Sequence, residues 1–209
     1  MKVAVFLFAG VTPLDAIGPC DALARLPEVS IEFCAPRAGT VYSQDGFVGL
    51  QARAMGEIDA ADVLLVPGGS REGLTAVLAS QEVLDWVARI HARTVYTTSV
   101  CTGSLILGAA GVIKGQAVST HWRAKDFLPR FEALYSNERV TRNGKLLTAA
   151  GVTAGIDLGL TLCGLIAGPE AGAAVELAME YCPAPPFGGH RFSDAPASVV
   201  EAVSTRLRA

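Results

Sequence analysis

Charged residues are scarce in this sequence, at 18% of its 209 residues, and basic ones are not in excess. The formal net charge is −3, and lysine and arginine are scattered along the chain rather than gathered into a patch. A protein that binds nucleic acid or an anionic membrane surface through its charge needs a cluster of basic residues. The charge pattern therefore argues against both kinds of partner.

The motifs of common cofactor and metal sites are also missing. The three histidines, His91, His121 and His190, lie far apart and show no metal-ligand spacing, which argues against a zinc site. No GxGxxG follows a predicted strand, no serine sits in a GxSxG elbow, and Gly144-Lys145 lacks the preceding glycine of a P-loop. We therefore expect no cofactor and no metal.

Signals for disulfides, export and membrane insertion are absent as well. The five cysteines form no CxxC pair, and their odd number does not suit an extracellular disulfide framework. The opening MKVAVFLFAG is a short apolar run with no small-x-small cleavage site after it, so it indicates a buried strand. The later apolar stretch Leu158–Gly168 is too short to span a bilayer. We expect a cytoplasmic protein.

Hydrophobic residues, by contrast, make up 51% of the chain, which suits a large core and a homodimer. Apolar or β-branched runs predict buried strands at Lys2–Ala9, Val29–Ala35, Val63–Val66 and Thr94–Val100. Turn residues predict hairpins within Thr40–Ala52 and Glu138–Ala149. Helical patterns follow Pro13, Gly69 and Cys101, and recur at Ala154–Ala167, at Glu170–Tyr181 and from Ala197. The alternation predicts one α/β domain over residues 1–209, with a flavodoxin-like, doubly wound, mostly parallel sheet and helices on both faces.

Chemically useful residues follow three of the predicted strands. Asp15 comes after the first strand, Gly68 and Gly69 after VLLVP, and Cys101 directly after TVYTTSV. In open α/β sheets, reactive groups collect beyond the carboxyl ends of the strands, so these segments are expected to meet at one crevice. Each signal is weak alone, and their convergence indicates a cysteine-nucleophile enzyme.

Cys101 is the candidate nucleophile because it sits at a sharp strand-to-helix turn. The unpaired amides and the dipole of a helix N-terminus favour thiolate over thiol, so we expect a lowered pKa. The alternative is a buried cysteine that acts as a small hydrophobic residue. That alternative is favoured for Cys20, Cys34, Cys163 and Cys182, which lie in apolar segments or near the proline-rich tail.

The neighbouring candidates also have structural alternatives. Gly68 and Gly69 can point backbone amides into the crevice as an oxyanion site, or they can simply end a strand. Burial between an apolar strand and an apolar helix would raise the pKa of Asp15 and make it a useful proton donor, although an acid in a first helical turn can serve the helix dipole alone. Thr102 either caps the helix or hydrogen-bonds to the reacting atom.

Motifs along nearly the whole chain resemble those of the ThiJ/PfpI-like superfamily, which is related to class I glutamine amidotransferases. They are PLDAIGPCDAL around Asp15, LLVPGG at 64–69, TSVCTGSL at the elbow, and GVTAGIDLGLTL at 151–162. Together with STHW and EYCPAPPF, the set is most similar to isocyanide hydratases. The resemblance adds Gly151 and Val152 to the expected oxyanion or substrate-binding residues.

The resemblance implies a lyase of the hydro-lyase class that hydrates an isocyanide, R–N≡C, to an N-substituted formamide. A Cys101 thiolate would add to the terminal carbon to give a thioimidate, and Asp15 would act as general acid and base. Relatives with peptidase or amidotransferase chemistry carry a histidine beside the nucleophile, whereas Thr102 follows Cys101 here. His121 is the only substitute, and its place in STHW favours a structural role.

Two other functions remain open at this stage. The elbow and GVTAGID also occur in the ligand-sensing modules of transcription regulators, which would need further residues for a helix-turn-helix region. A redox-protective protein could oxidise Cys101, and glyoxalase-like relatives are a related possibility. The acidic charge and the Asp at position 15, where stress-response relatives carry Glu, favour the hydratase.

Overall fold

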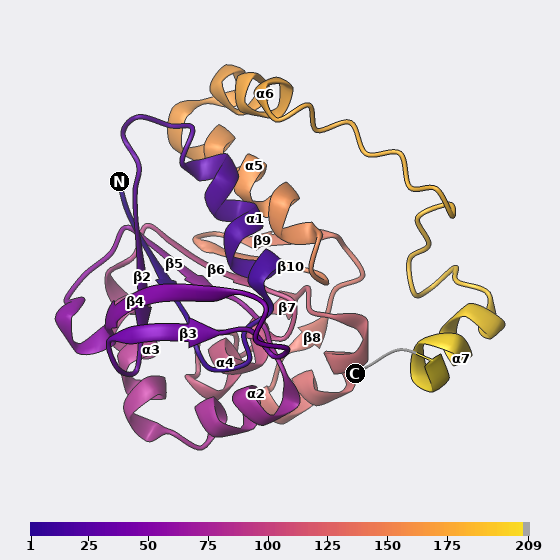
Figure 1. The fold of residues 1–209 in the computed structure, drawn as a ribbon, viewed down its shortest axis with the longest axis horizontal. Coiled ribbons are helices and arrows are strands. Elements are labelled where there is room, and N and C mark those ends of the chain that lie inside the picture. Colours follow the sequence, from indigo (N-terminus) through magenta and orange to yellow (C-terminus); the bar gives the residue numbers. More distant parts are fainter. Residues whose placement is uncertain (207–209) are drawn as a thin grey trace.

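A computed structural model describes residues 1–206 and contains an eight-stranded sheet (Figure 1). In spatial order its strands are β3 (Gly39–Tyr42), β4 (Gly49–Ala54), β2 (Ser30–Ala35), β1 (Lys2–Phe6), β5 (Val63–Val66), β6 (Tyr96–Val100), β10 (Leu146–Ala149) and β9 (Val140–Asn143). The six inner strands are parallel, and the two outer strands pair antiparallel to their neighbours. The predicted mostly parallel sheet is therefore confirmed, as are both hairpins.

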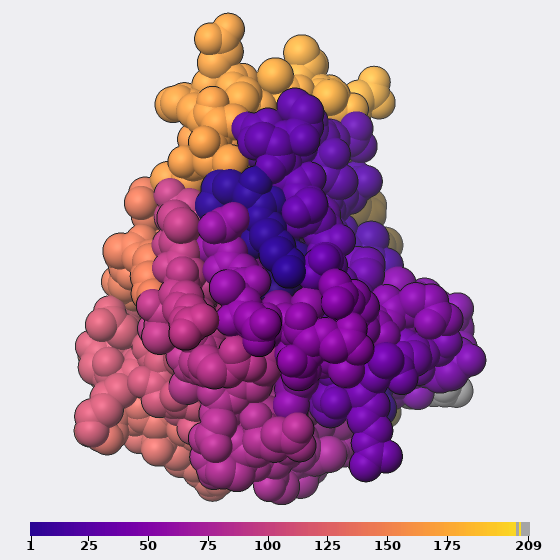
Figure 2. All heavy atoms as spheres, turned by 90° about the vertical axis from the view of Figure 1, so that its left-hand side faces the viewer, coloured from indigo at the N-terminus to yellow at the C-terminus, as the bar shows by residue number. Residues whose placement is uncertain are grey.

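Helices cover both faces of the sheet, as the alternating pattern predicted. One face carries α1 (Pro13–Leu23) and α5 (Ala154–Ala167), and α6 (Pro169–Ala178) packs on α5. The other face carries α2 (Arg71–Leu78), α3 (Gln81–Arg93), α4 (Gly103–Ala109) and the 3₁₀ segment η2 (Trp122–Phe131). In the space-filling view of Figure 2, α6 (orange) stands out at one end of the molecule.

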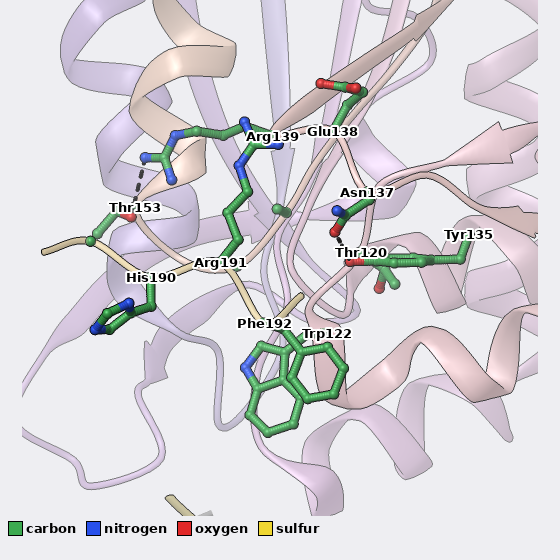
Figure 3. A pocket seen from close by; sticks show the side chains of 13 residues that line it. Thr120, Trp122, Tyr135, Asn137, Glu138, Arg139, Thr153, His190, Arg191 and Phe192 are labelled. Atoms are coloured by element: carbon green, nitrogen blue, oxygen red, sulfur yellow. Dashed lines mark hydrogen bonds between the residues drawn. The ribbon is translucent and has the colours of Figure 1, made fainter. Parts of the chain in front are cut away.

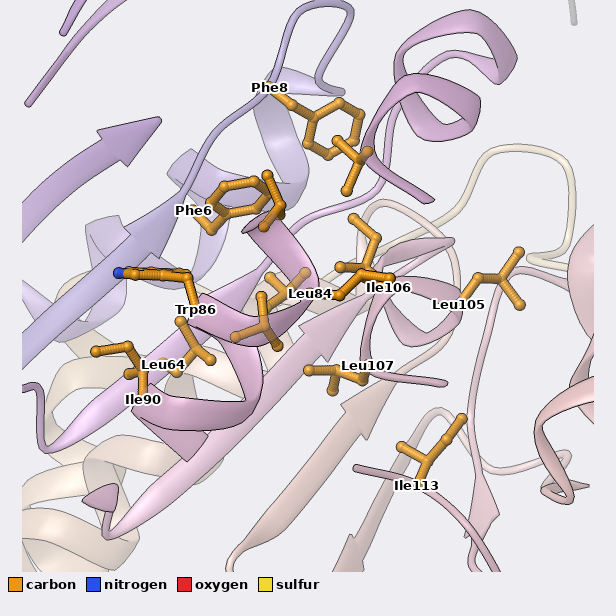
Figure 4. Packing of buried hydrophobic residues seen from close by; sticks show 14 of the residues in the cluster. Phe6, Phe8, Leu64, Leu84, Trp86, Ile90, Leu105, Ile106, Leu107 and Ile113 are labelled. Atoms are coloured by element: carbon orange, nitrogen blue, oxygen red, sulfur yellow. The ribbon is translucent and has the colours of Figure 1, made fainter. Parts of the chain in front are cut away.

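The core forms two layers because side chains alternate along the central strands. Val3 and Val5 of β1, and Leu7 just after it, lie in the layer with α1 and α5. The residues between and after them face the opposite layer, namely Ala4, Phe6 and Phe8. Figure 4 shows this second layer, in which the rings of Phe6 and Trp86 lie 5.6 Å apart. The near-continuous apolar run of the first strand thus reflects burial on both faces.

The sequence patterns did not predict every element. The first strand ends at Phe6 rather than Ala9, and α2 precedes the predicted helix α3 as a separate helix. Between α4 and β9 the chain forms β7 (Ala117–Val118), η2 and β8 (Leu134–Tyr135), and a further 3₁₀ turn, η1, covers Met55–Glu57. Short 3₁₀ turns and two-residue strands leave no clear periodicity in a sequence, which is why these elements were missed.

The C-terminal part of the chain leaves the sheet after α6. Residues 182–196 have no regular structure and run along the outside of the molecule to α7 (Ala197–Arg206), drawn in yellow in Figure 1. The predicted C-terminal helix is therefore present. That residues 1–209 behave as one domain remains a prediction.

Close packing of α1 against α5 depends on a helical glycine. A Cβ atom added at Gly159 would lie 2.7 Å from the Cα atom of Pro19 and 3.0 Å from the Cβ atom of Ala22. Backbone cannot yield as a flexible side chain does, so the two helices approach this closely only because position 159 has no side chain.

We expect Gly159→Ala to force α1 away from α5 and to lower the free energy of unfolding by about 1–3 kcal/mol. Gly164→Ala is the matched control, because a Cβ atom there meets nothing within 4 Å. That control should raise helix stability by about 0.5–1 kcal/mol. Urea unfolding followed by circular dichroism measures both changes, and equal effects would contradict the packing argument.

Candidate active site

Cys101 lies at the turn between β6 and α4, where the sequence placed the nucleophile. Its backbone has φ = +58°, a left-handed conformation that is uncommon outside glycine. The N–H of Cys101 donates to the carbonyls of Ala149 and Ala150, at 3.2 and 2.8 Å. Gly103 begins α4 against β5, since an added Cβ atom would lie 2.1 Å from the Val66 carbonyl oxygen. The predicted sharp elbow is confirmed.

Two buried hydroxyl groups hold the elbow from below. Thr120 Oγ1 donates to the carbonyl oxygen of Cys101 at 3.1 Å, and Ser104 Oγ donates to Thr120 Oγ1 at 2.7 Å. Both side chains are almost fully buried. Neither residue was predicted from the sequence to act at the elbow, although Thr120 belongs to the STHW motif. These bonds support the strained turn that presents the sulfur.

Asp15 is fully buried in the first turn of α1 and faces the same elbow. Its Oδ2 atom accepts a hydrogen bond from the Gly68 N–H at 2.9 Å. Its Oδ1 atom is buried and has no hydrogen-bond partner of standard geometry in residues 1–206. Burial raises the pKa of Asp15 to about 7, although the Gly68 amide and the Cys101 thiol partly oppose the rise. The expected rise in the pKa of this carboxyl is thus found.

The Cys101 side chain is only 7% exposed, and its surroundings do not favour a free thiolate. Burial and the neighbouring Asp15 charge raise its pKa to about 12. The N–H groups of Val152 and Thr102 donate to the sulfur and oppose this rise without reversing it. The expectation of a thiolate created by the helix N-terminus was therefore wrong. Burial and the Asp15 charge thus favour the thiol form of Cys101 over the thiolate.

Gly68 and Gly69 lie at the predicted crevice, but their backbone N–H groups already donate hydrogen bonds to other residues of the site. The Gly68 N–H binds Asp15, and the Gly69 N–H donates to Thr102 Oγ1 at 3.2 Å. A Cβ atom at Gly68 would lie 2.5 Å from Thr102 Oγ1 and 3.0 Å from Asp15 Oδ2. The prediction that these two glycines form an oxyanion site is corrected accordingly: they position Asp15 and Thr102.

Thr102 has a different role from a helix cap. Its side chain makes no capping hydrogen bond to α4, and its hydroxyl accepts from Gly69 while its backbone N–H donates to the Cys101 sulfur. One residue therefore contacts both the PGG turn and the nucleophile. The hydroxyl proton remains able to donate to a group bound above Cys101.

Gly151 and Val152 complete the sulfur's surroundings. Val152 has φ = +27°, a strained value for a β-branched residue, and its N–H points at the Cys101 sulfur. A Cβ atom at Gly151 would lie 2.7 Å from His121 Cδ2, so glycine allows His121 to approach. His121 Nδ1 accepts from the Arg123 N–H at 3.3 Å at the start of η2, and burial lowers its pKa. These contacts agree with the structural role expected for His121.

The remaining cysteines lie outside the site. Cys20, Cys34 and Cys163 are buried with pKa values raised by burial, whereas Cys182 is exposed. In residues 1–206, no group of three His, Cys, Asp or Glu side chains is placed to hold a metal ion. No helix in the same part of the chain has the length and hydrophobicity to cross a membrane.

Comparisons with known proteins place this site among relatives. The chain is 38% identical over 206 residues to an isonitrile hydratase from Pseudomonas putida, covering 99% of this chain and 90% of that protein. It is 30% identical to the HTH-type transcriptional regulator CdhR of Pseudomonas aeruginosa, covering 68% of this chain but 42% of the regulator. The crystal structure of a ThiJ/PfpI family protein from Pseudomonas syringae superimposes with a TM-score of 0.91 at 35% identity, over 98% of this chain and 86% of that one.

A family model agrees with these relatives. The DJ-1/PfpI family model matches residues 1–164, which include Asp15, the PGG turn, Cys101 and Val152. The resemblance noted from the motifs is thereby confirmed at the level of the whole fold. This chain belongs to the DJ-1/PfpI family.

Proposed function

We propose that this protein is a hydro-lyase that converts isocyanides to N-substituted formamides, with Cys101 as nucleophile and Asp15 as its proton partner. The observation that carries the proposal is the buried pair of a thiol and a carboxyl whose pKa is raised to about 7. A near full-length relative named isonitrile hydratase supports the choice of substrate class. The proposal includes no cofactor and no metal.

The first step joins sulfur to the terminal isocyanide carbon. As the carbon approaches, the Cys101 thiol proton moves to Asp15, and the sulfur electron pair forms the C–S bond. Asp15 then delivers that proton to the same carbon, which gives the thioimidate R–N=CH–S–Cys101. Oδ1 is the oxygen suited to this transfer, because Oδ2 is bound to the Gly68 N–H. The N–H groups at the sulfur stabilise the passing thiolate.

The second step uses water and returns the enzyme to its starting state. Asp15 takes a proton from water as the oxygen attacks the thioimidate carbon, and Asp15 then gives this proton to the nitrogen. The adduct R–NH–CH(OH)–S–Cys101 then loses the sulfur, which recovers the hydroxyl proton as R–NH–CHO leaves. Atoms balance as isocyanide plus water giving formamide.

This chemistry needs no free N–H groups at the PGG turn. The backbone amides of Gly68 and Gly69 can therefore serve to position Asp15 and Thr102. An isocyanide has no carbonyl oxygen, so addition of sulfur creates charge at carbon rather than an oxyanion. A proton donor at carbon is then more useful than a pair of free N–H groups. A histidine base is also unnecessary, because the Asp15 carboxylate can accept the thiol proton directly.

The alternatives rest on weaker observations. A regulator-type sensing domain is supported by the likeness to CdhR, yet the chain aligns with less than half of that protein. A redox-protective role needs an exposed cysteine of low pKa, whereas Cys101 is 7% exposed and its pKa is raised. The burial and raised pKa of Cys101 also give no reason to prefer a glyoxalase-like reaction to isocyanide hydration.

We also propose that the protein is a cytoplasmic homodimer. The two large apolar side chains Leu14 and Ile17 remain 39% and 37% exposed on α1, and Leu177 of α6 is 80% exposed. Covering such residues in a second copy would remove apolar surface from water. Sedimentation at micromolar concentration decides the matter, and a monomer mass would exclude the dimer.

We expect Cys101→Ala to abolish consumption of p-nitrophenyl isocyanide, because no other described thiol faces Asp15. Cys182→Ser is the matched control, since Cys182 is the exposed cysteine and lies outside the site. It should keep wild-type activity. Formamide production followed by chromatography measures both variants, and residual turnover in Cys101→Ala would remove cysteine catalysis from the proposal.

We expect kcat/KM to rise with pH and to reach half its plateau near pH 7. Below the Asp15 pKa of about 7 the carboxyl is protonated and cannot accept the thiol proton, so activity falls as pH falls. Asp15→Asn should lower the rate by about 10²- to 10⁴-fold and remove this step from the profile. A profile that keeps its step near pH 7 in Asp15→Asn would assign the titration to another group.

Asp15→Asn should also change the pKa of Cys101. Because the Asp15 charge helps to raise the pKa of Cys101, Asp15→Asn should lower that pKa while burial keeps it elevated. Ultraviolet absorbance of the thiolate, titrated in a Cys182→Ser background with Cys101→Ala as blank, measures the shift. An unchanged or higher pKa would show that the two groups do not share a proton.

A further inference from the structure

The strained backbone at Val152 lies between two segments that a single arginine holds. Before it, the carbonyl oxygen of Arg139 accepts from the Ala150 N–H at 2.9 Å, and the Ala150 carbonyl accepts from the Cys101 N–H at 2.8 Å. After it, Nη2 of Arg139 donates to Thr153 Oγ1 at 3.2 Å, the dashed line between these two side chains in Figure 3. Arg139 therefore spans the turn from which the Val152 N–H points at the sulfur.

Asp157, in the first turn of α5, gathers further contacts to the same segment. Arg139 Nε donates to its Oδ2 atom at 2.7 Å, and the hydroxyl of Tyr181 donates to the same oxygen at 3.0 Å. Tyr181 comes after α6 and belongs to EYCPAPPF, a motif to which the proposed chemistry gives no part. We call Arg139, Asp157 and Tyr181 the Asp157 clamp. It joins the segment before β9, the start of α5 and the end of α6 at one carboxylate.

The clamp is suited to hold a conformation rather than to stabilise the whole fold. A β-branched residue at positive φ is strained, and such strain persists only where surrounding contacts oppose its release. A guanidinium group presents several N–H donors in a rigid fork, so Arg139 can hold Thr153 and Asp157 at once. The ion pair is partly exposed, at 44% and 28% for its two side chains, and therefore adds little to global stability.

We propose that the Asp157 clamp holds the Val152 N–H against the Cys101 sulfur, which makes its three members positioning residues. The inference rests on the proposed function and adds these side chains to it. The Val152 N–H favours the thiolate of Cys101 against the effect of burial. Once the thiol proton has left, that N–H faces a full negative charge, and its hydrogen bond becomes stronger. Without the clamp the turn relaxes, the N–H moves away, and the thiolate forms less often.

The experiment measures the rate constant for alkylation of Cys101 by iodoacetamide at a fixed pH. Arg139→Met keeps the apolar stem and removes the hydrogen bonds of the side chain. A Cys182→Ser background removes the exposed thiol. We expect the rate constant to fall about threefold in Arg139→Met, because a smaller fraction of Cys101 is thiolate. A general loosening of the structure would expose the sulfur and speed the reaction, so an equal or faster rate overturns the inference.

Asp157→Asn separates positioning from charge. By charge alone, loss of a cation and loss of an anion change the thiolate fraction in opposite directions, whereas loss of the clamp slows alkylation in both variants. Opposite changes in Asp157→Asn and Arg139→Met would overturn the inference.

Arg53→Met is the matched control for loss of an arginine ion pair. Arg53 pairs with Glu32 and Glu57 at 3.3 and 3.0 Å, on β4 toward the opposite edge of the sheet from β9. Its alkylation rate should equal that of wild type. A fall as large as that in Arg139→Met would overturn the specific role of the clamp.

Alkylation needs no isocyanide, so it separates this inference from the proposed function. Failure of the wild type to hydrate isocyanides would overturn the proposed function and leave the alkylation result standing. With turnover, kcat for p-nitrophenyl isocyanide should fall about threefold to tenfold in Arg139→Met at unchanged KM, the effect of a weakened hydrogen bond that acts on the reacting sulfur. A raised KM at unchanged kcat would overturn the positioning role.

Discussion

The hydrogen bond from the Gly68 N–H to Asp15 is the contact on which the arrangement of the site depends. It fixes a fully buried carboxyl group at 2.9 Å from a backbone turn, and within the described residues the other oxygen has no hydrogen bond of standard geometry. Burial then raises the pKa of that carboxyl to about 7, and its charge helps keep the proton on Cys101. Because α1, the PGG turn and the elbow all meet at this bond, the sheet topology and the proton chemistry are linked.

Backbone strain at two residues helps to place the Cys101 sulfur and the N–H group that faces it. Cys101 and Val152 both adopt positive φ values, at which side chains with a Cβ atom are disfavoured. The first directs the sulfur out of the strand, and the second directs an N–H toward it. Buried hydroxyls under the elbow and the close contact of Gly151 with His121 support these conformations. Such strain persists only where surrounding contacts outweigh it, which accounts for the dense packing around the turn.

The fold was predictable because its signals are local. Buried parallel strands such as β5 appear as short apolar runs, and Asn143-Gly144 marks a hairpin directly. The position of Cys101 at the elbow followed from the order of strand and helix. The hydrogen-bond partners of the Gly68 and Gly69 amides could not be predicted in this way, because they depend on which buried groups lie nearby in the folded protein. The protonation of Cys101 was likewise set by Asp15 and by burial, neither of which is a property of the helix terminus alone.

The family match and the C-terminal segment divide the chain into two parts. The groups proposed for bond making lie within residues 1–164, the part that the family model matches, whereas residues 182–196 lie beyond it and have no regular structure. Every strand of the eight-stranded sheet lies before that stretch, between Lys2 and Ala149. Insertions or deletions within residues 182–196 would therefore change the chain length outside both the sheet and the family-matched part.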